Sequence, residues 1–221
     1  MSWAEQAAVP LENDYVLLRP VQPEDRAELK AIAIEPKIWR YFPFRVATEA
    51  DFDVFFDLGL TDMNAGTRVA YYISSKRTGG AAGSMSFGNL AEKDGRLEIG
   101  WSWLGLGSQG TGINKWAKFL MMQHAFEKMG VERVEFKTDQ LNVQARHALC
   151  NIGAREEGTL RSFNPMPDGR RRDAVYYSVL KAEWPHVKEQ LLTGPKVDWA
   201  AATAGGSGGS SLRASTAESA G

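Results

Sequence analysis

A glycine-rich stretch in the middle of the chain has the residue types that bind phosphate groups. An apolar run over residues 97–104 precedes it, and apolar residues at helical spacing follow it. Between them, four of eight residues are glycine: Gly105, Gly107, Gly110 and Gly112. Glycine permits positive φ and a close approach of the backbone, and the first N–H groups of a helix are free to bind an anion. The order of strand, glycine turn and helix therefore predicts a phosphate site.

The same glycines admit a second interpretation, a dinucleotide-binding turn. Gly105, Gly107 and Gly110 have the spacing Gly-x-Gly-x-x-Gly, which needs to open a βαβ unit with an acidic residue about 20 positions later. Here the turn follows three β-type runs, and Glu127 and Glu132 miss the end of the next strand. A dinucleotide-dependent oxidoreductase stays as an alternative hypothesis. A nucleoside triphosphatase is not expected, because no Gly-Lys-Ser or Gly-Lys-Thr follows the glycines.

Glu98 is the candidate general base beside this turn, because it lies within an apolar strand run. Strict alternation would place it on the same face as Gly100 and Ser102, with Trp101 on the opposite face. A carboxylate in that position can take a proton from a substrate directly or through water. The alternative is a surface residue that pairs with Arg96 or with a neighbouring strand.

The sequence around the turn predicts a mixed α/β domain at residues 14–192. Runs with β character occupy residues 15–20, 67–74, 81–88, 96–104, 131–139, 155–163 and 173–180. Helical patterns occupy residues 23–34, the region from Thr48 to Gly66, the stretch from the glycine turn to Met129, and residues 142–151. Short turns between the runs from 67 to 104 favour an antiparallel meander, and the strand–helix–strand order that follows predicts a right-handed parallel crossover. We expect a loose lead-in at residues 1–13 and a flexible Gly/Ser/Ala-rich tail at 193–221.

Composition limits the function further. The 221 residues carry a net charge of −1, which gives no electrostatic basis for a nucleic-acid partner. One cysteine, Cys150, and three scattered histidines predict neither an internal disulfide nor a zinc site. The N-terminus has no secretory pattern, and no apolar run reaches the roughly 18 residues that span a membrane. These features predict a cytoplasmic protein with no metal and no membrane partner.

The start of the long helix, Gln109-Gly110-Thr111-Gly112, resembles the pyrophosphate loop of the GNAT superfamily of N-acetyltransferases, although Asn114 stands where Gly or Ala is usual. The resemblance extends over about residues 14–185 and is strongest to the RimJ/RimL-like branch, which is related to ribosomal-protein N-terminal acetyltransferases. It includes Leu18-Arg19-Pro20, the strand Leu97–Trp101, Asn142 and the pair Gly153-Ala154. It implies a mostly antiparallel, centrally splayed sheet of six to seven strands flanked by helices.

The resemblance also implies acetyl-CoA as co-substrate and a primary amine, on a small molecule or a protein N-terminus, as acceptor. The cofactor residues would then be Trp101, Trp103, Gln109, Gly110, Thr111, Gly112, Ile113, Asn114 and Asn142. Backbone N–H groups of the turn would bind the pyrophosphate, one near Trp101–Trp103 would polarise the thioester carbonyl, and Asn142 would contact the pantetheine arm. The alternative for Asn142 is an ordinary helix N-cap. The aromatic residues Trp39, Tyr41 and Phe42 would line the acceptor pocket, or else pack in the core.

Two features leave alternatives open. Relatives often have a Ser or a Tyr in the helix after the asparagine to protonate the leaving thiolate, and the matching positions here are Ala145 and Leu149. Cys150, Tyr176 and Tyr177 are other candidates, although a thiol with a pKa of about 8.5 needs no dedicated acid. The missing acid keeps open a non-catalytic acyl-CoA-binding sensor.

Arg161 and residues 170–172 form a basic cluster that is either solvated surface or a contact to the cofactor's ribose phosphate or an acidic acceptor. Monomer and homodimer are both compatible with the sequence.

Overall fold

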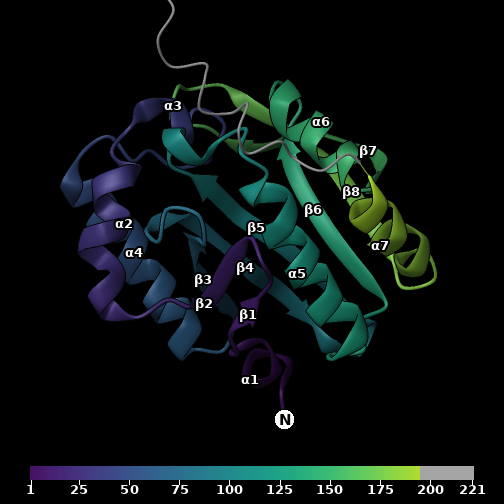
Figure 1. Cartoon of the computed structure of the whole chain (residues 1–221). Coiled ribbons are helices and arrows are strands. Elements are labelled where there is room, and N and C mark those ends of the chain that lie inside the picture. The colour runs from purple at the N-terminus through teal and green to yellow at the C-terminus, as the bar shows by residue number, and fades with distance from the viewer. Residues whose placement is uncertain (195–221) are drawn as a thin grey trace, which may run out of the picture.

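An eight-stranded mixed sheet forms the centre of the computed structural model, which describes residues 1–194 (Figure 1). Its order is β1-β2-β3-β4-β5-β6-β8-β7, and every neighbouring pair is antiparallel except β5 and β6. The strands are β1 (Leu11–Glu12), β2 (Val16–Pro20), β3 (Arg68–Ser75), β4 (Ala81–Ala91), β5 (Arg96–Leu104), β6 (Arg133–Asp139), β7 (Arg155–Pro165) and β8 (Arg171–Leu180). The mixed, mostly antiparallel sheet confirms the predicted fold class, but the count of six to seven strands was one short.

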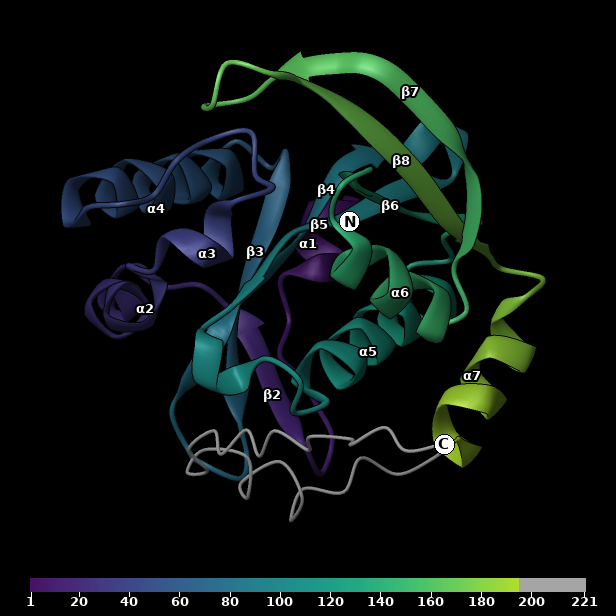
Figure 2. The same cartoon turned by 90° about the horizontal axis from the view of Figure 1, so that it is seen from above.

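Helices cover both faces of the sheet. Successive side chains of a strand point to opposite faces, so apolar residues on both faces of a buried strand give one core on each side. Along β3, Val69, Tyr71 and Ile73 join one core, and Ala70 and Tyr72 join the other. Figure 2 shows the two layers on opposite sides of the strands. The first core is covered by α1 (Trp3–Ala7), α5 (Ile113–Glu127), α6 (Val143–Asn151) and α7 (Trp184–Thr193), and the second by α2 (Arg26–Ala33), α3 (Pro36–Trp39) and α4 (Glu49–Asn64). Short 3-10 turns occupy Pro23–Asp25, Glu92–Asp94 and Leu106–Ser108.

The central splay lies between β5 and β6. These parallel strands pair at only three positions, of which the last joins Glu98 to Glu135. Both strands continue beyond that point, β5 to Leu104 and β6 to Asp139, without pairing to each other. The sheet is therefore open on one side of Glu98, and the helices α5 and α6 that flank β6 in sequence border the opening.

The first residues of the chain differ from the expected loose lead-in. Ser2 caps α1 through a reciprocal bond with Glu5, and Trp3 and Ala7 are buried in the first core. The hydroxyl of Tyr71 donates to the carbonyl of Ala7, which fastens this segment to the sheet. A five-residue helix is too short to give a periodic pattern, and its one local signal is the Ser2-x-x-Glu5 spacing of the capping box. The domain boundaries 14–192 stay a prediction, and most of the predicted tail, residues 195–221, lies outside the described residues.

Candidate functional site

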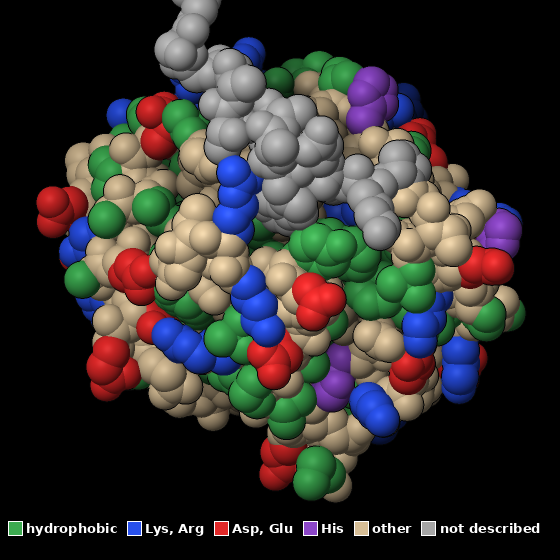
Figure 3. Space-filling view, in the orientation of Figure 1, with side chains coloured by type: hydrophobic (Ala, Val, Ile, Leu, Met, Phe, Trp, Pro, Cys, Tyr) green, Lys and Arg blue, Asp and Glu red, His purple; other side chains and the backbone are tan. Residues whose placement is uncertain are grey.

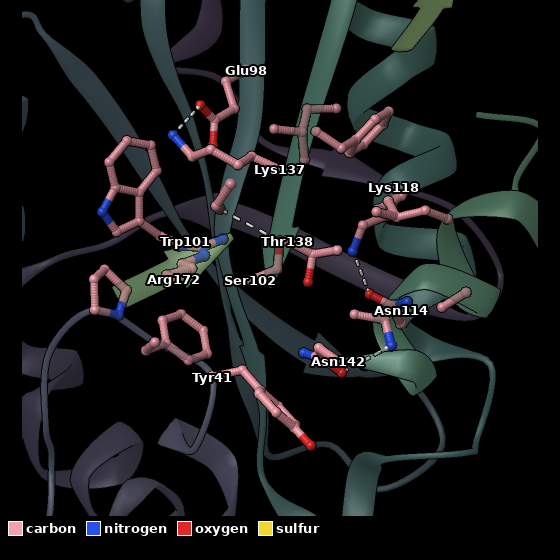
Figure 4. Close-up of a pocket in the computed structure, with 18 of the residues that line it drawn as sticks. Tyr41, Glu98, Trp101, Ser102, Asn114, Lys118, Lys137, Thr138, Asn142 and Arg172 are labelled. Carbon is pink, nitrogen blue, oxygen red and sulfur yellow. Dashed lines mark hydrogen bonds and ion pairs between the residues drawn. The ribbon is translucent and has the colours of Figure 1, made fainter. Parts of the chain in front are cut away.

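A cavity of about 350 Å³ lies where β5 and β6 separate. Residues of β5, β6, α5 and α6 line it, together with the loop after α3 and one arginine of β8 (Figure 4). Six of the predicted site residues meet here: Tyr41, Phe42, Glu98, Trp101, Asn114 and Asn142. The opening in the sheet thus gathers side chains that are far apart in the sequence.

A β-bulge in β5 turns extra residues toward the cavity. Between two paired positions, β5 has two residues, Trp101 and Ser102, where β4 has only Met85. Trp101 has a φ of 49°, which is rare for a residue with a side chain. The alternation expected from the sequence was wrong at this point, because all residues from 98 to 102 line the same cavity. The Trp101 ring lies over Gly88, where an added Cβ would come within 2.4 Å of it.

Glu98 is buried, with 5% of its surface exposed, and it faces the cavity. Its Oε2 accepts a hydrogen bond from Asn89 Nδ2 at 2.6 Å and lies 3.4 Å from Lys137 Nζ. Its Oε1 accepts no hydrogen bond from the described residues. Of the alternative pairings, the one with Arg96 does not occur, since Arg96 pairs with Asp94 and Glu135, but the one with a neighbouring strand does, through Lys137 of β6. Glu98 therefore has one carboxylate oxygen held in place and one available to a ligand or a water.

Lys118 is a site residue that the sequence analysis missed. It lies on α5 and lines the cavity with only 6% of its surface exposed. Its Nζ bonds Asn114 Oδ1 at 2.5 Å and lies 3.9 Å from Met85 Sδ, and it forms no ion pair within residues 1–194. Burial lowers the pKa of this amine from 10.5 to about 7. The available signal was a single lysine inside the otherwise apolar stripe of the helix.

The arginines of residues 170–172, which are adjacent in sequence, have different surroundings in the structure. Arg170 pairs with Asp139 and Asp168, and Arg171 bonds Ser162. Arg172 points instead into the cavity, where it is 6% exposed. No hydrogen bond or ion pair joins the side chain of Arg172 to another described residue, and its buried Nε has no partner. Burial lowers the pKa of this guanidinium.

The glycine turn has the backbone geometry expected of an anion site. Gly110 has a φ of 72°, and Gly112, which precedes the first residue of α5, has a φ of 85°. The backbone N–H groups of residues 110–114 donate to no acceptor within the described chain. Side chains hold the turn from within, since Gln109 Nε2 donates to the Leu104 carbonyl at 3.1 Å and the Thr111 hydroxyl donates to Ser108. Ile113 is buried in the first core, so only its N–H is available.

Asn142 combines two roles that the sequence analysis treated as alternatives. Its Oδ1 accepts a hydrogen bond from the Ala145 N–H at 3.1 Å and so caps α6. The same side chain lines the cavity, and its Nδ2 donates to none of the described acceptors. The cap fixes the amide in orientation and leaves the two N–H donors of Nδ2 for a ligand.

Two predicted residues lie elsewhere. Trp39 and Trp103 are buried in the second core, with their ring centroids 5.4 Å apart, and neither lines the cavity. Trp39 Nε1 donates to the Ala33 carbonyl at 2.8 Å, which identifies it as a core residue. The cavity lining also lacks the three other candidates for protonating the leaving thiolate, Cys150, Tyr176 and Tyr177.

Searches of residues 1–194 for two other kinds of site were negative. None of the helices there is long and apolar enough to cross a membrane. No group of three or more His, Cys, Asp or Glu side chains in that range is arranged to hold a metal ion. Acidic and basic side chains are intermingled on the face in Figure 3, in keeping with the net charge of −1.

Known proteins share both the sequence pattern and the fold. Residues 16–155 match the acetyltransferase (GNAT) domain family. The N-acetyltransferase p20 of Bacillus licheniformis, named as uncharacterised, is 26% identical over 179 residues, which are 79% of this chain and 97% of that protein. The Bacillus subtilis (strain 168) protein named "Putative ribosomal N-acetyltransferase YdaF" is 34% identical over 106 residues, 48% of this chain and 57% of that protein.

Solved structures agree with these relatives. A GCN5-related N-acetyltransferase from Brucella melitensis has a TM-score of 0.77 and 27% identity, with 84% of each chain covered. Mycobacterium smegmatis RimJ, solved in complex with CoA-disulfide, has the same fold, with a TM-score of 0.70 at 23% identity over 83% of this chain and 91% of that one. The family match, the curated relatives and the splayed sheet agree, and the chain belongs to the GNAT family of acetyltransferases, with RimJ/RimL-like proteins among its relatives.

Proposed function

We propose that this acetyltransferase transfers the acetyl group of acetyl-CoA to a primary amine by direct attack, with Glu98 as the general base. The observation that carries the proposal is the opening between β5 and β6. It puts a buried carboxylate with one available oxygen in the same cavity as Asn114 in the first turn of α5, directly after a glycine turn with free N–H groups.

The residues present fit acetyl-CoA along its length. Free N–H groups of residues 110–114 suit the pyrophosphate without a lysine. The arm that follows carries amides, and β5 beyond Glu98 has no strand partner on its open side to compete for them. Asn142 Nδ2 can donate to the same arm, and a backbone N–H of the bulge near Trp101 can polarise the thioester carbonyl.

In this mechanism the neutral amine nitrogen attacks the thioester carbon and forms a tetrahedral intermediate. The amine proton passes to Glu98, directly or through water, as the C–N bond forms. Collapse of the intermediate breaks the C–S bond and releases CoA as a thiolate. Ala145 and Leu149 have no proton to give, and Lys118, on the helix that follows the glycine turn, is a cavity residue that can offer the sulfur a positive charge or a proton.

The relative named a ribosomal N-acetyltransferase supports a protein N-terminus as acceptor, and a small-molecule amine is the other class. A single, exposed cysteine fits a reducing compartment such as the cytoplasm. The mechanism requires no metal ion.

The test is acetyl transfer by the full chain over a panel of amines, followed by the loss of thioester absorbance. That readout avoids a thiol-reactive dye, which the exposed Cys150 would also consume. Glu98→Gln should lower kcat by about 10²–10⁴ near pH 7. The deficit should shrink at high pH, where an α-amine with a pKa of about 8 is already neutral.

The matched control is Glu135→Gln, because Glu135 is the register partner of Glu98 on β6 but lies outside the cavity, where its carboxylate pairs with Arg96 and Arg133. Full activity in Glu98→Gln would contradict the base assignment. Stabilisation by acetyl-CoA without transfer to any amine would favour the acyl-CoA-binding sensor, and stabilisation by NAD alone would favour the oxidoreductase.

A further inference from the structure

Arg172 is a buried positive charge without a partner. Its side chain is 6% exposed, its Nε has no hydrogen-bond acceptor, and no carboxylate forms an ion pair with it among the described residues. An arginine keeps its charge at any ordinary pH. A buried charge is normally paired, because removal from water is costly. The isolation of Arg172 therefore points to a ligand.

The neighbouring carboxylates do not account for Arg172. Asp139 and Glu98 are the acidic groups whose charge acts on it. Asp139 already accepts from Arg170 at 2.5 Å and from the Leu141 N–H at 2.9 Å. Glu98 is occupied at Oε2 by Asn89 and Lys137. Glu98 Oε1 is free, but neither Glu98 nor Asp139 forms an ion pair with Arg172, whose side chain lines the cavity.

The position of Arg172 separates it from the expected phosphate site. Pairing between β6 and β8 ends at Asp139 and Ala174, and Arg172 lies beyond that end. In Figure 4 it lies beside Trp101 on one side of the cavity, and Asn114 and Lys118 lie on the opposite side. The glycine turn adjoins Asn114, so Arg172 stands on the side away from the pyrophosphate.

The charge of the whole lining agrees with an anionic ligand. Its charged residues are one acid, Glu98, and three bases, Lys118, Lys137 and Arg172. Lys137 and Glu98 offset each other, so the remaining positive charge comes from Arg172 and the protonated fraction of Lys118. A lining with this net charge disfavours polycations. Among small-molecule amines, a polyamine or an aminoglycoside is therefore disfavoured relative to an amine that carries an acid.

We propose that the acceptor amine carries a carboxylate and that Arg172 binds this carboxylate through its planar pair of N–H donors. Arginine is the side chain suited to this geometry, because the guanidinium fork matches a carboxylate bidentately. The carboxylate is either that of a free amino acid or an acidic side chain near a peptide N-terminus. This inference rests on the proposed N-acetyltransferase function and names its substrate class.

The test compares acceptors that differ in one charge. The pairs are a free amino acid against its amide, and a peptide amide beginning Ala-Asp against one beginning Ala-Asn, with spermidine as the polycation. The wild-type protein should prefer the carboxylate member of at least one pair by about 10-fold or more in kcat/KM. The pair that discriminates identifies the source of the carboxylate.

Arg172→Gln should abolish that preference, because it raises the KM of the carboxylate member by more than that of the uncharged member. Arg172→Lys should recover part of the preference, since it restores the charge without the fork. Arg171→Gln is the matched control, because Arg171 bonds Ser162 on the surface. Equal use of both members by the wild-type protein, or equal loss of both in Arg172→Gln, would overturn the proposal.

A binding experiment keeps the inference testable if no amine is acetylated. N-acetyl amino acids and their amides are then titrated against the protein with CoA, and thermal stabilisation is recorded. Stabilisation by the carboxylate form in the wild-type protein and not in Arg172→Gln supports the anion site even though the proposed activity has failed. The N-acetylated forms of the Ala-Asp and Ala-Asn peptide amides are titrated in the same way to test the acidic side chain. No difference between the two forms in either pair overturns the proposal.

Discussion

Exchange of Lys118 for methionine tests the electrostatics of the cavity most directly. Methionine keeps an unbranched side chain of similar length and removes the amine. Lys118 is fully buried beside Asn114 and Met85 without an ion-pair partner, and its pKa falls from 10.5 to about 7 as a result. Lys118→Met should therefore change not only the stability of the protein but also how that stability depends on pH.

The direction follows from proton binding. Between pH 7 and about 10 the unfolded chain binds a proton at Lys118 that the folded chain does not hold. The free energy of unfolding of the wild-type protein therefore rises with pH in this window, relative to the variant. A shift from 10.5 to about 7 corresponds to at most about 5 kcal/mol. Between pH 7 and pH 9 the unfolding free energy of the wild-type protein should rise by about 2 kcal/mol relative to that of Lys118→Met. Below pH 7 the difference between the two unfolding free energies should be nearly constant.

The assay is urea unfolding of the ligand-free proteins at pH 6, 7, 8 and 9. Lys128→Met, at the exposed end of the same helix, controls for the exchange of a lysine for methionine. The informative quantity is the difference in unfolding free energy between wild type and variant at each pH. A difference that is flat from pH 6 to pH 9 would refute the assignment of Lys118 as a desolvated amine.

Three further substitutions test the elements that hold the site. Gly88→Ala should displace the Trp101 ring, because its Cβ would lie 2.4 Å from that ring, and kcat should fall with little change in acetyl-CoA affinity measured by calorimetry. Gly112→Ala should destabilise the protein by about 1 kcal/mol in urea unfolding and weaken acetyl-CoA binding, since a φ of 85° disfavours a side chain. Thr48→Ala should cost about 1 kcal/mol in unfolding free energy through the lost capping box with Asp51, while kcat stays unchanged; an altered kcat would mean that α4 influences the site.

Local signals predicted much of this fold. Thr48 followed by acidic residues was identified as a helix start, and the structure has the reciprocal cap there. The strand–turn–helix stretch fell where expected, with β5 matching residues 96–104. The splay between β5 and β6 followed from the family resemblance and not from spacing, because a gap between two strands leaves no periodic signal.

The errors in the site have physical causes. Alternation predicts side-chain direction only in a regular strand, and one extra residue in β5 turned Trp101 toward the face of Glu98. Adjacent arginines look equivalent in sequence, yet the pleat sends Arg171 to the surface and Arg172 into the cavity. Trp39 and Trp103 pack in the second core because their large apolar surfaces find partners in each other and in the phenylalanines of α4.

The opening in the sheet also has a mechanical consequence. The backbone ladder between β5 and β6 has only three register pairs, supplemented by the side-chain pairs Glu98–Lys137 and Arg96–Glu135, whereas longer ladders join β4 to β5, β6 to β8 and β7 to β8. The seam beyond Glu98 is thus the line along which the sheet is least cohesive. A ligand that touches both edges of the seam acts as a crosslink, and its binding free energy adds to the resistance of the two halves to separation. Ligand occupancy of the cavity and the resistance of the two halves of the sheet to separation are coupled for that reason. Slower amide hydrogen exchange in residues 99–104 on addition of acetyl-CoA would measure the coupling.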